Sequence, residues 1–505
     1  EFRAKEVDVI GTEDRELFEI ERLNDQETLV KMWELSKKGK KKDLMYERIF
    51  KSDETKEIHL YGNGDDDEFR ISGEVNKGIK LRCIGGLGKD TFVDESKVGG
   101  LGKKTLFYDD KRTNYLTLGS EAKDKTTDEA IYNIYDRRAY SYEYGYTIPI
   151  PIIGLNPDDG FILGGTFLNT SYNFKKEPFS SKHLFSGLYA FQTQSFEFNY
   201  IGDYLNTFGE FDFYLDATVK NPSYSSNYFG YGNGSVADVE EQGIDFYRIR
   251  QGLVRIHPAF KKRLGSVDNF LTFGPLFERS EIQDTPNRIL TTGNPPNISD
   301  DIFIHRNRIG AEAGFNFYNV DDRVVPHRGL NFIANAKWLN SLDDTNLRFT
   351  KLAGELAIYQ NLDRKQNLVL ALRVGFGHII GDLNEDFFFD DAPTIGGESP
   401  LRGYREQRFY GNTTFYQNTD LRLRLFTTNN RVLPFTLGIF GGFDVARAWT
   451  NDIENDSNQW HSSWGGGLWI SPLDAFTLSI GAFTPRNANE TEEDIQIVLT
   501  GGFSF

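Results

Sequence analysis

The residue types that carry out most enzyme chemistry are present in this sequence, but not at the spacing that the chemistry requires. Seven histidines are spread over 505 residues, and no HExxH or HxH pair is available to hold a metal ion. Two Gly-Lys pairs lie in glycine-rich turns, at 88–89 and 102–103. A phosphate-binding loop needs Ser or Thr next, where this chain has Asp90 and Lys104. We therefore expect no catalytic residues, no cofactor and no enzymatic activity in this chain.

One weak cation site is compatible with the acidic turns near the N-terminus. Residues 62–69 and 85–92 are alike at an offset of 23 residues (85 − 62), and the second stretch fits the GGxGxDxU form of calcium-binding β-rolls. Such a roll needs several stacked nonapeptides, whereas these two imperfect units lie too far apart. We interpret them as turns of a small β-domain. The alternative is a weak Ca²⁺ site at Asp65, Asp67 and Asp90.

The composition indicates the elements that must position such residues. Aromatic residues make up 14% of the chain and glycines number 49, yet the mean hydropathy is −0.49 and no run of 18 apolar residues occurs. A transmembrane β-barrel combines these properties, because only every second residue of each strand faces the lipid. The net charge of −17 excludes a general nucleic-acid binder. The single cysteine, Cys83, excludes a disulfide within the chain.

Apolar and polar residues alternate in many segments between residue 136 and the C-terminus, as they do on strands with two different faces. Turn clusters separate these segments, and together they predict about sixteen strands. A half-buried strand of a soluble sandwich shows the same alternation, but the aromatic end of this chain favours the barrel. We predict an all-β protein whose residues 136–505 form a transmembrane antiparallel β-barrel. The last strand carries one stripe of Ile495, Ile497, Leu499, Gly501, Phe503 and Phe505.

Residues 1–135 have a different character, with dense charge, few aromatic residues and shorter alternating stretches. They predict a separate, β-rich N-terminal domain. Residues 37–42 read KKGKKK, which we interpret as the solvated tip of a hairpin. Contact of this basic run with anionic lipid head groups is the alternative.

The most specific pattern is IGGESPLRGY at residues 395–404. Gly396, Gly397 and Gly403 allow tight turns in a confined space, and the guanidinium of Arg402 is best satisfied by a carboxylate in bidentate geometry. The pattern resembles the loop element of the BamA/TpsB superfamily of outer-membrane barrels. That resemblance implies a loop, at about 380–412 here, that folds back into the barrel lumen with Leu401-Arg402-Gly403-Tyr404 at its tip.

The resemblance also implies acidic partners for Arg402 on the inner wall. Asp444 stands at the acidic position of a strand that reads FGGFDVARAW, and Asp420 occupies the second acidic position, where Glu is more usual. Arg447 departs from the small residue common in relatives, a change that could alter the lumen. The resemblance covers about the last 370 residues and is strongest over the last 120.

The resemblance is closest to a Bacteroidota branch of the superfamily that is often fused to a calcineurin-like metallophosphoesterase. This sequence contains none of that enzyme's metal-binding motifs. The POTRA modules of many relatives, which pack two helices on a sheet, are not expected in residues 1–135. The implied location is the bacterial outer membrane, with the N-terminal domain in the periplasm.

The implied function is to help insert or pass proteins or lipids through a strand seam or the lumen. The seam would join a first strand near residues 139–148 to a last strand near 494–505. Glycines and a proline weaken pairing there, and a substrate strand could add to the exposed edge. Expected partners are outer-membrane lipid and lipopolysaccharide, nascent outer-membrane proteins or accessory subunits. A non-catalytic anchor within a larger complex and a passive channel are the alternatives. The seam residues are Gly145, Pro149, Gly501, Gly502 and Phe505.

Overall fold

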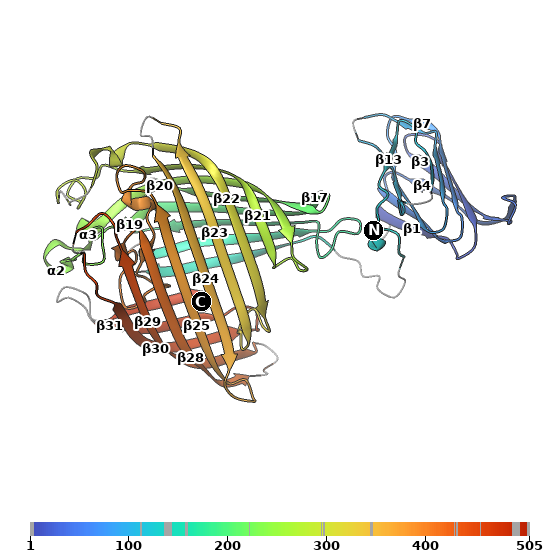
Figure 1. Ribbon diagram of the computed structural model, residues 1–505. Helices are drawn as coiled ribbons and strands as arrows, with labels where there is room; N and C mark the ends of the chain where they lie inside the picture. Colours follow the sequence, from blue (N-terminus) through green and yellow to red (C-terminus); the bar gives the residue numbers. More distant parts are fainter. Residues whose placement is uncertain are drawn as a thin grey trace. The chain divides into compact units, whose positions relative to one another are not determined.

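The computed structural model divides into two compact units, Glu1–Glu143 and Tyr144–Phe505 (Figure 1). Each unit is described by itself. Within the described part of the chain, no helix is long and apolar enough to cross a membrane. The described residues are 5–100, 102–111, 114–135, 144–156, 160–221, 223–293, 295, 298–343, 347–428, 430, 433–454, 456–486 and 495–501.

The N-terminal unit is a β-solenoid, in which successive turns of the chain add parallel strands to the same sheets. One sheet is parallel throughout, in the order β1 (Glu6–Ile10), β5 (Glu57–Gly64), β8 (Lys80–Leu87), β11 (Thr105–Tyr108) and β13 (Ala122–Asp124). The second has the order β12 (Tyr115–Thr117), β9 (Thr91–Asp94), β6 (Glu68–Ser72), β2 (Glu16–Arg22), β3 (Glu27–Leu35) and β4 (Lys41–Lys51). Two short strands, β7 (Glu74–Val75) and β10 (Lys97–Val98), also pair, and the 3-10 helix η1 spans Ala130–Tyr132.

The sequence repeat of 23 residues is one coil of this solenoid. Phe69 on β6 lies opposite Phe92 on β9 in parallel register, and Phe18 on β2 lies opposite Phe69. Their rings stack with centroids 5.0 and 4.7 Å apart, and Phe107 continues the column at 4.8 Å from Phe92. Because equivalent residues stack directly, the column buries large aromatic area along the axis of the unit.

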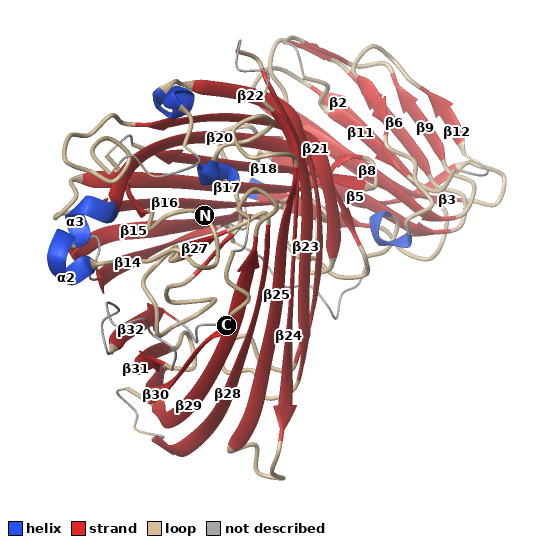
Figure 2. Cartoon of the chain, turned by 60° about the vertical axis from the view of Figure 1, so that its left-hand side comes forward, coloured by secondary structure: helices blue, strands red, loops and turns tan. Residues whose placement is uncertain are grey.

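The C-terminal unit is one antiparallel sheet of 17 strands, which curves as a barrel wall (Figure 2). One of them, β19 (Ser225–Asn227), is a short strand beside the end of β20, so the long strands among the described residues number sixteen, in agreement with the prediction of about sixteen. The others are β14 (Tyr146–Asn156), β15 (Gly160–Ser171), β16 (Ser181–Ala190), β17 (Ser195–Phe208), β18 (Phe211–Lys220), β20 (Arg248–Arg263), β21 (Phe270–Ile282), β22 (Arg306–Val320), β23 (Gly329–Ser341), β24 (Arg348–Asn361), β25 (Leu368–Ile380), β28 (Thr413–Thr428), β29 (Phe435–Trp449), β30 (His461–Pro472), β31 (Leu478–Pro485) and β32 (Gln496–Gly501).

The wall is apolar outside and polar inside, as expected of a barrel in lipid. On β28, Leu421 is 46% exposed on the outer face, while its neighbours Asp420 and Arg422 are buried on the inner face. On β32, Ile497 and Leu499 are exposed, which confirms the alternation on which the barrel prediction rested. The connections contain the helices α2 (Val239–Gln242), α3 (Ile244–Tyr247), η2 (Asp300–Phe303) and η3 (Phe389–Asp391), and two short strands described below.

The first described strand, β14, starts at Tyr146, and it carries both prolines, Pro149 and Pro151, within its length. Residues 139–143 of the predicted first strand lie outside the described residues. An end strand of a sheet tolerates proline on its outer edge. β14 and β32 are the two ends of the sheet order, and they approach within 8 Å between Cα atoms.

Candidate functional site in the barrel lumen

The connection between β25 and β28, residues 381–412, folds back against the inner wall. It contains η3 and an antiparallel pair of short strands, β26 (Thr394–Ile395) and β27 (Phe409–Tyr410). Gly396 and Gly397 follow β26 with φ angles of 119° and 94°, which side chains rarely adopt, so this turn depends on glycine. Leu401 and Tyr404 at the tip are buried. We call residues 381–412 the lumenal loop.

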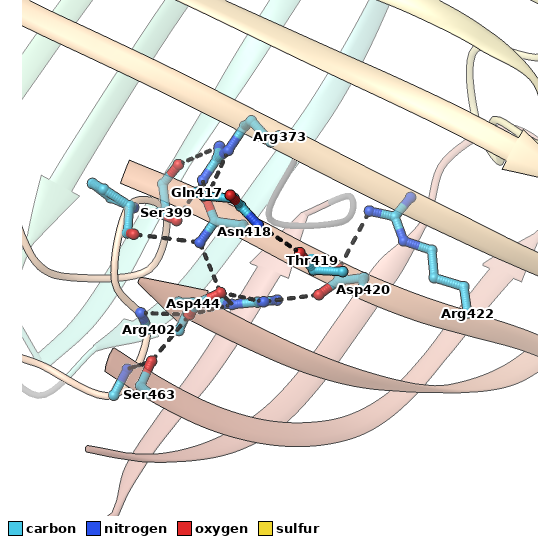
Figure 3. Close-up of polar contacts among 12 residues, drawn as sticks. Arg373, Ser399, Arg402, Gln417, Asn418, Thr419, Asp420, Arg422, Asp444 and Ser463 are labelled. Carbon is cyan, nitrogen blue, oxygen red and sulfur yellow. Dashed lines mark hydrogen bonds and ion pairs between the residues drawn. The ribbon is translucent and has the colours of Figure 1, made fainter. Parts of the chain in front are cut away.

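Arg402 at the tip of the lumenal loop is fully buried between two carboxylates (Figure 3). Its Nε donates to Asp444 Oδ2 at 2.9 Å, and its Nη2 donates to Asp444 Oδ1 at 2.6 Å and to Asp420 Oδ1 at 2.8 Å. The backbone N–H of Arg402 also donates to Asp444 Oδ2 at 3.0 Å. The structure therefore places Arg402 in bidentate contact with Asp444 and in a second ion pair with Asp420.

Neighbouring strands support this ion pair through a row of residues in register. Arg373 on β25 lies opposite Asn418 on β28, Asn418 lies opposite Asp444 on β29, and Asp444 lies opposite Ser463 on β30. Asn418 Nδ2 donates to Asp444 Oδ1 at 2.7 Å, and Ser463 Oγ donates to Asp444 Oδ2 at 3.1 Å. Arg373 Nε donates to Asn418 Oδ1 at 3.0 Å, which orients the amide (Figure 3). Every oxygen of Asp444 thus has several donors.

The loop side of the site is held by the same row. Arg373 Nη1 donates to Ser399 Oγ at 2.6 Å, and the N–H of Gly403 donates to Ser463 Oγ at 3.1 Å. Because donors and acceptors come from both the wall and the loop, the position of the tip is fixed along and across the strands. Sequence reasoning missed Arg373, Asn418 and Ser463. Their only signal was period-two placement of polar residues on strands.

A glycine on the wall makes room for the guanidinium. Gly442 lies opposite Asp420 in the ladder between β28 and β29. A Cβ at this position would stand 2.5 Å from Arg402 Nη2 and 2.8 Å from Asp420 Oδ1. The ring of Phe483 covers the guanidinium from another side, with its centroid 4.1 Å from Arg402 Cζ. The site is therefore a closed slot for one planar cation.

Arg447 does not enter the lumen. Asp444, Ala446 and Ala448 form the buried face of β29, and Arg447 has the opposite parity. Its guanidinium lies over Trp449 at 4.9 Å from the ring centroid and near Trp460 at 5.9 Å. The expectation that this departure from the family pattern alters the lumen is therefore wrong, because alternation sends the side chain outward.

A second set of ion pairs ties the beginning of the lumenal loop to another part of the wall. Arg306 holds Asp390 in bidentate geometry, with distances of 2.7 and 2.9 Å. Arg308 donates to Asp391 at 2.5 Å and to Glu278 on β21 at 2.9 Å. All five residues are buried or nearly so. Sequence reasoning gave no indication of these pairs, because their partners lie about 80 residues apart in an ordinary charged composition.

A third tether comes from residues 225–235, between β18 and β20. Asn233 is fully buried. Its Nδ2 donates to the carbonyls of Ser457 and Gln459 at 2.9 Å, and its Oδ1 accepts from the N–H of Ala448 at 3.0 Å. The lumenal loop joins this segment through Arg408, whose Nη1 donates to Ser235 Oγ at 3.0 Å. The segment therefore connects the loop to the end of β29 and to the connection that follows it.

The residues of the predicted seam are only partly described. Gly145 directly precedes β14, Pro149 lies within it, and Gly501 ends β32. Gly502 and Phe505 lie outside the described residues.

The predicted calcium residues do not converge. Asp67 and Asp90 are fully buried at equivalent positions of successive coils, whereas Asp65 is exposed. Asp90 Oδ1 accepts from the N–H of Asp67 at 2.8 Å, and Asp67 Oδ1 accepts from the N–H of Glu16 at 2.7 Å. Over the described residues, no group of three or more His, Cys, Asp or Glu is placed to hold a metal ion. The Ca²⁺ site stays a prediction from the sequence.

Glu16, Asp67, Asp90 and Asp109 instead form a column inside the solenoid, which we call the carboxyl ladder. Burial raises the pKa of Asp67 to about 10 and that of Asp109 to about 8, and neighbouring carboxylates reinforce the shift. The pKa of Asp90 rises to about 6 from the same burial. Because the charged forms are disfavoured, members of the ladder hold protons near neutral pH.

Comparison with known proteins places this geometry in context. A family model described as the Omp85 superfamily domain matches residues 185–505. The structure of BamA from Haemophilus ducreyi lacking POTRA domains 1–3 is similar at 12% identity, with 72% of this chain and 70% of that chain covered and a TM-score of 0.51. CdiB from Escherichia coli gives 13% identity, 71% and 62% coverage and a TM-score of 0.43. This chain thus spans less than two thirds of the CdiB chain. No curated protein matches the sequence.

Proposed function

Because the chain belongs to the Omp85 superfamily over residues 185–505, we propose that it is an outer-membrane barrel that helps insert proteins or lipids into the membrane or pass them across it. The family and the BamA-like fold support assembly or translocation as the general role. Barrels of this family are outer-membrane proteins. We place this chain there too, with its N-terminal unit in the periplasm.

The observation that carries the proposal is the lumenal loop held by Arg402. A passive channel would need no buried cation slot at the tip of an internal loop, since burial of three charges costs several kcal/mol unless each is well paired. The loop also borders a polar cavity of about 490 Å³ that is lined by Glu398 and Arg405 of the loop, Lys220 of β18 and Gln496 of β32. The cavity therefore links the loop to the last strand, where the seam is proposed.

The edge of β14 supports a seam that can open. Pro149 and Pro151 pair with Phe167 and Gly165 of β15 in unbroken register. Residues two apart direct their N–H groups to the same edge of a strand. Since the ladder to β15 is continuous, the two missing donors face the opposite edge, on the side of β32. The seam between β14 and β32 therefore lacks two hydrogen bonds, so a substrate strand that pairs with β32 displaces β14 more easily.

In this proposal the chain acts without catalytic groups or a cofactor. Its partners are nascent outer-membrane or secreted proteins, lipid including lipopolysaccharide, and accessory subunits. The chain supplies an edge for strand addition and, a few strands away on β28, β29 and β30, a braced part of the wall.

The proposal is tested with the purified chain in liposomes. An eight-stranded outer-membrane protein, unfolded in urea, is added, and its folding is followed by gel mobility and protease protection. We expect faster folding than in empty liposomes. Arg402→Ala should lower the rate, whereas Arg364→Ala, which changes an exposed turn residue, should not. Equal rates in loaded and empty liposomes would refute an insertion role.

The N-terminal unit favours a second candidate, an anchor within a larger complex. In its described residues it is a solenoid of strands with one 3-10 helix, not a unit with two helices packed on a sheet. An accessory role predicts that the chain, purified from its native membrane, carries a fixed set of subunits. It also predicts that the chain does not accelerate folding in liposomes.

A further inference from the structure

Strand β4 forms an end of the second sheet of the solenoid. It pairs with β3 along one side, and no other described strand pairs with its opposite side. The strand is 11 residues long and exposed over almost its whole length, with only Phe50 buried. Such an edge presents a row of backbone donors and acceptors that a further strand can occupy.

The edge is strongly basic in an acidic protein. Residues 37–51 contain seven Lys or Arg and two Asp or Glu, a net charge of +5, whereas the whole chain has −17. Ion pairs within the unit involve Lys41 with Glu19 at 2.6 Å and Lys42 with Glu34 at 2.5 Å. The remaining tip lysines, Lys37, Lys38 and Lys40, are exposed. The basic hairpin tip predicted from the sequence is therefore next to the β4 edge, which is also basic.

Apolar side chains lie among these charges. Leu44, Met45 and Ile49 are 41%, 43% and 50% exposed. Lysines alone on an edge strand are a common protection against unwanted pairing. Three exposed apolar side chains on the same strand work against that protection, and they offer area that a partner strand can bury.

We propose that the β4 edge is a docking site for an acidic, extended segment of a partner protein, which adds to the sheet as a seventh strand. Complementary charge selects the partner, backbone hydrogen bonds hold it, and its apolar residues cover Leu44, Met45 and Ile49. A second copy of the chain is disfavoured, because two edges of net charge +5 would face each other. The proposal is independent of the role assigned to the barrel.

The probe is a labelled nonapeptide that alternates Glu and Val, titrated with the full-length chain in detergent micelles and followed by fluorescence anisotropy. We expect saturable binding that weakens with added salt. The variant K37Q/K38Q/K40Q should bind about fivefold more weakly, as three exposed charge contacts imply. The matched control K77Q/K89Q/K123Q removes three exposed lysines elsewhere in the same unit and should bind as the wild type does.

A second peptide separates strand pairing from charge alone. It has the same side chains, but alternate backbone nitrogens are methylated, so it cannot pair along a strand edge. We expect no binding of this peptide. The proposal is overturned if both peptides bind equally, if neither binds, or if the two lysine variants behave alike. It is also overturned if vesicles containing phosphatidylglycerol displace the peptide and this displacement requires the three tip lysines. Self-association of the chain through this edge would overturn it as well.

Discussion

Loss of the Arg402 side chain should destabilise the barrel by several kcal/mol. Arg402 and Asp444 are 0% exposed and Asp420 is 1% exposed, so Arg402→Ala leaves two buried carboxylates without their main cation. Removal of one partner from a buried ion pair typically costs about 3–5 kcal/mol. Asp444 retains Asn418 and Ser463, and Asp420 retains Arg422 at 3.4 Å. We therefore expect the free energy of unfolding to fall by an amount near the lower limit of this range, about 3 kcal/mol.

The assay is urea unfolding of the full chain in micelles, followed by the gel band of the folded barrel. Arg364→Ala is the control, because this exposed turn residue should change stability by less than about 0.5 kcal/mol. A cycle with Asp444→Asn measures the pair itself. The double variant should be more stable than the sum of the single losses predicts, with a coupling of about 2 kcal/mol. If the two losses add within about 0.5 kcal/mol, the residues do not interact as described.

Three further predictions concern the wall, the third tether and the solenoid. Gly442→Ala should lower the same unfolding midpoint, because its Cβ would meet Arg402 Nη2 at 2.5 Å; an unchanged midpoint would mean that the slot is wider. Asn233→Ala should increase protease cleavage in the connection after β29, where its amide holds two carbonyls, and cleavage equal to the wild type would contradict that role. In the carboxyl ladder, raised pKa values mean that the folded unit binds more protons than the unfolded chain from about pH 4 up to about pH 8 for Asp109 and about pH 10 for Asp67. The stability of the folded unit should thus fall as pH rises, by up to about 1.4 kcal/mol per pH unit and proton. Pulse proteolysis in urea at several pH values tests the sign of this slope. Asp109→Asn should make stability depend less steeply on pH.

Alternation of residue types was sufficient to predict the barrel and its sixteen long strands, because a wall between lipid and a polar lumen forces period two on every strand. Proline was expected to weaken pairing near the seam, and Pro149 and Pro151 lie within β14, where the outer edge of an end strand needs no donor. Likewise, the 23-residue offset was visible as two similar turns only. Phe69 and Phe92 repeat at this offset, but the other positions of the strands differ in residue type. The solenoid can therefore be recognised only when the strand register is known.

Only the part of the site that belongs to short family motifs could be predicted from the sequence. Arg402, Asp420 and Asp444 were identified from the resemblance, and their distances follow from β28 and β29 being neighbours. The pairs of Arg306 and Arg308 with the lumenal loop could not be identified, because any acidic residue could satisfy a buried arginine on sequence grounds. Long-range pairing is a property of the fold and is not encoded locally.

The three tethers of the lumenal loop determine how a functional defect in Arg402→Ala should be interpreted. The loop remains bound through Asp390 and Asp391 at its beginning and through Arg408 near its end, so loss of Arg402 does not release it from the lumen. What changes is the position of residues 396–404 relative to the row on β28, β29 and β30. A variant that stays folded but no longer accelerates folding would therefore show that the exact seating of the tip matters for the activity. A variant that is active whenever it is folded would reduce the buried pair to a stabilising contact.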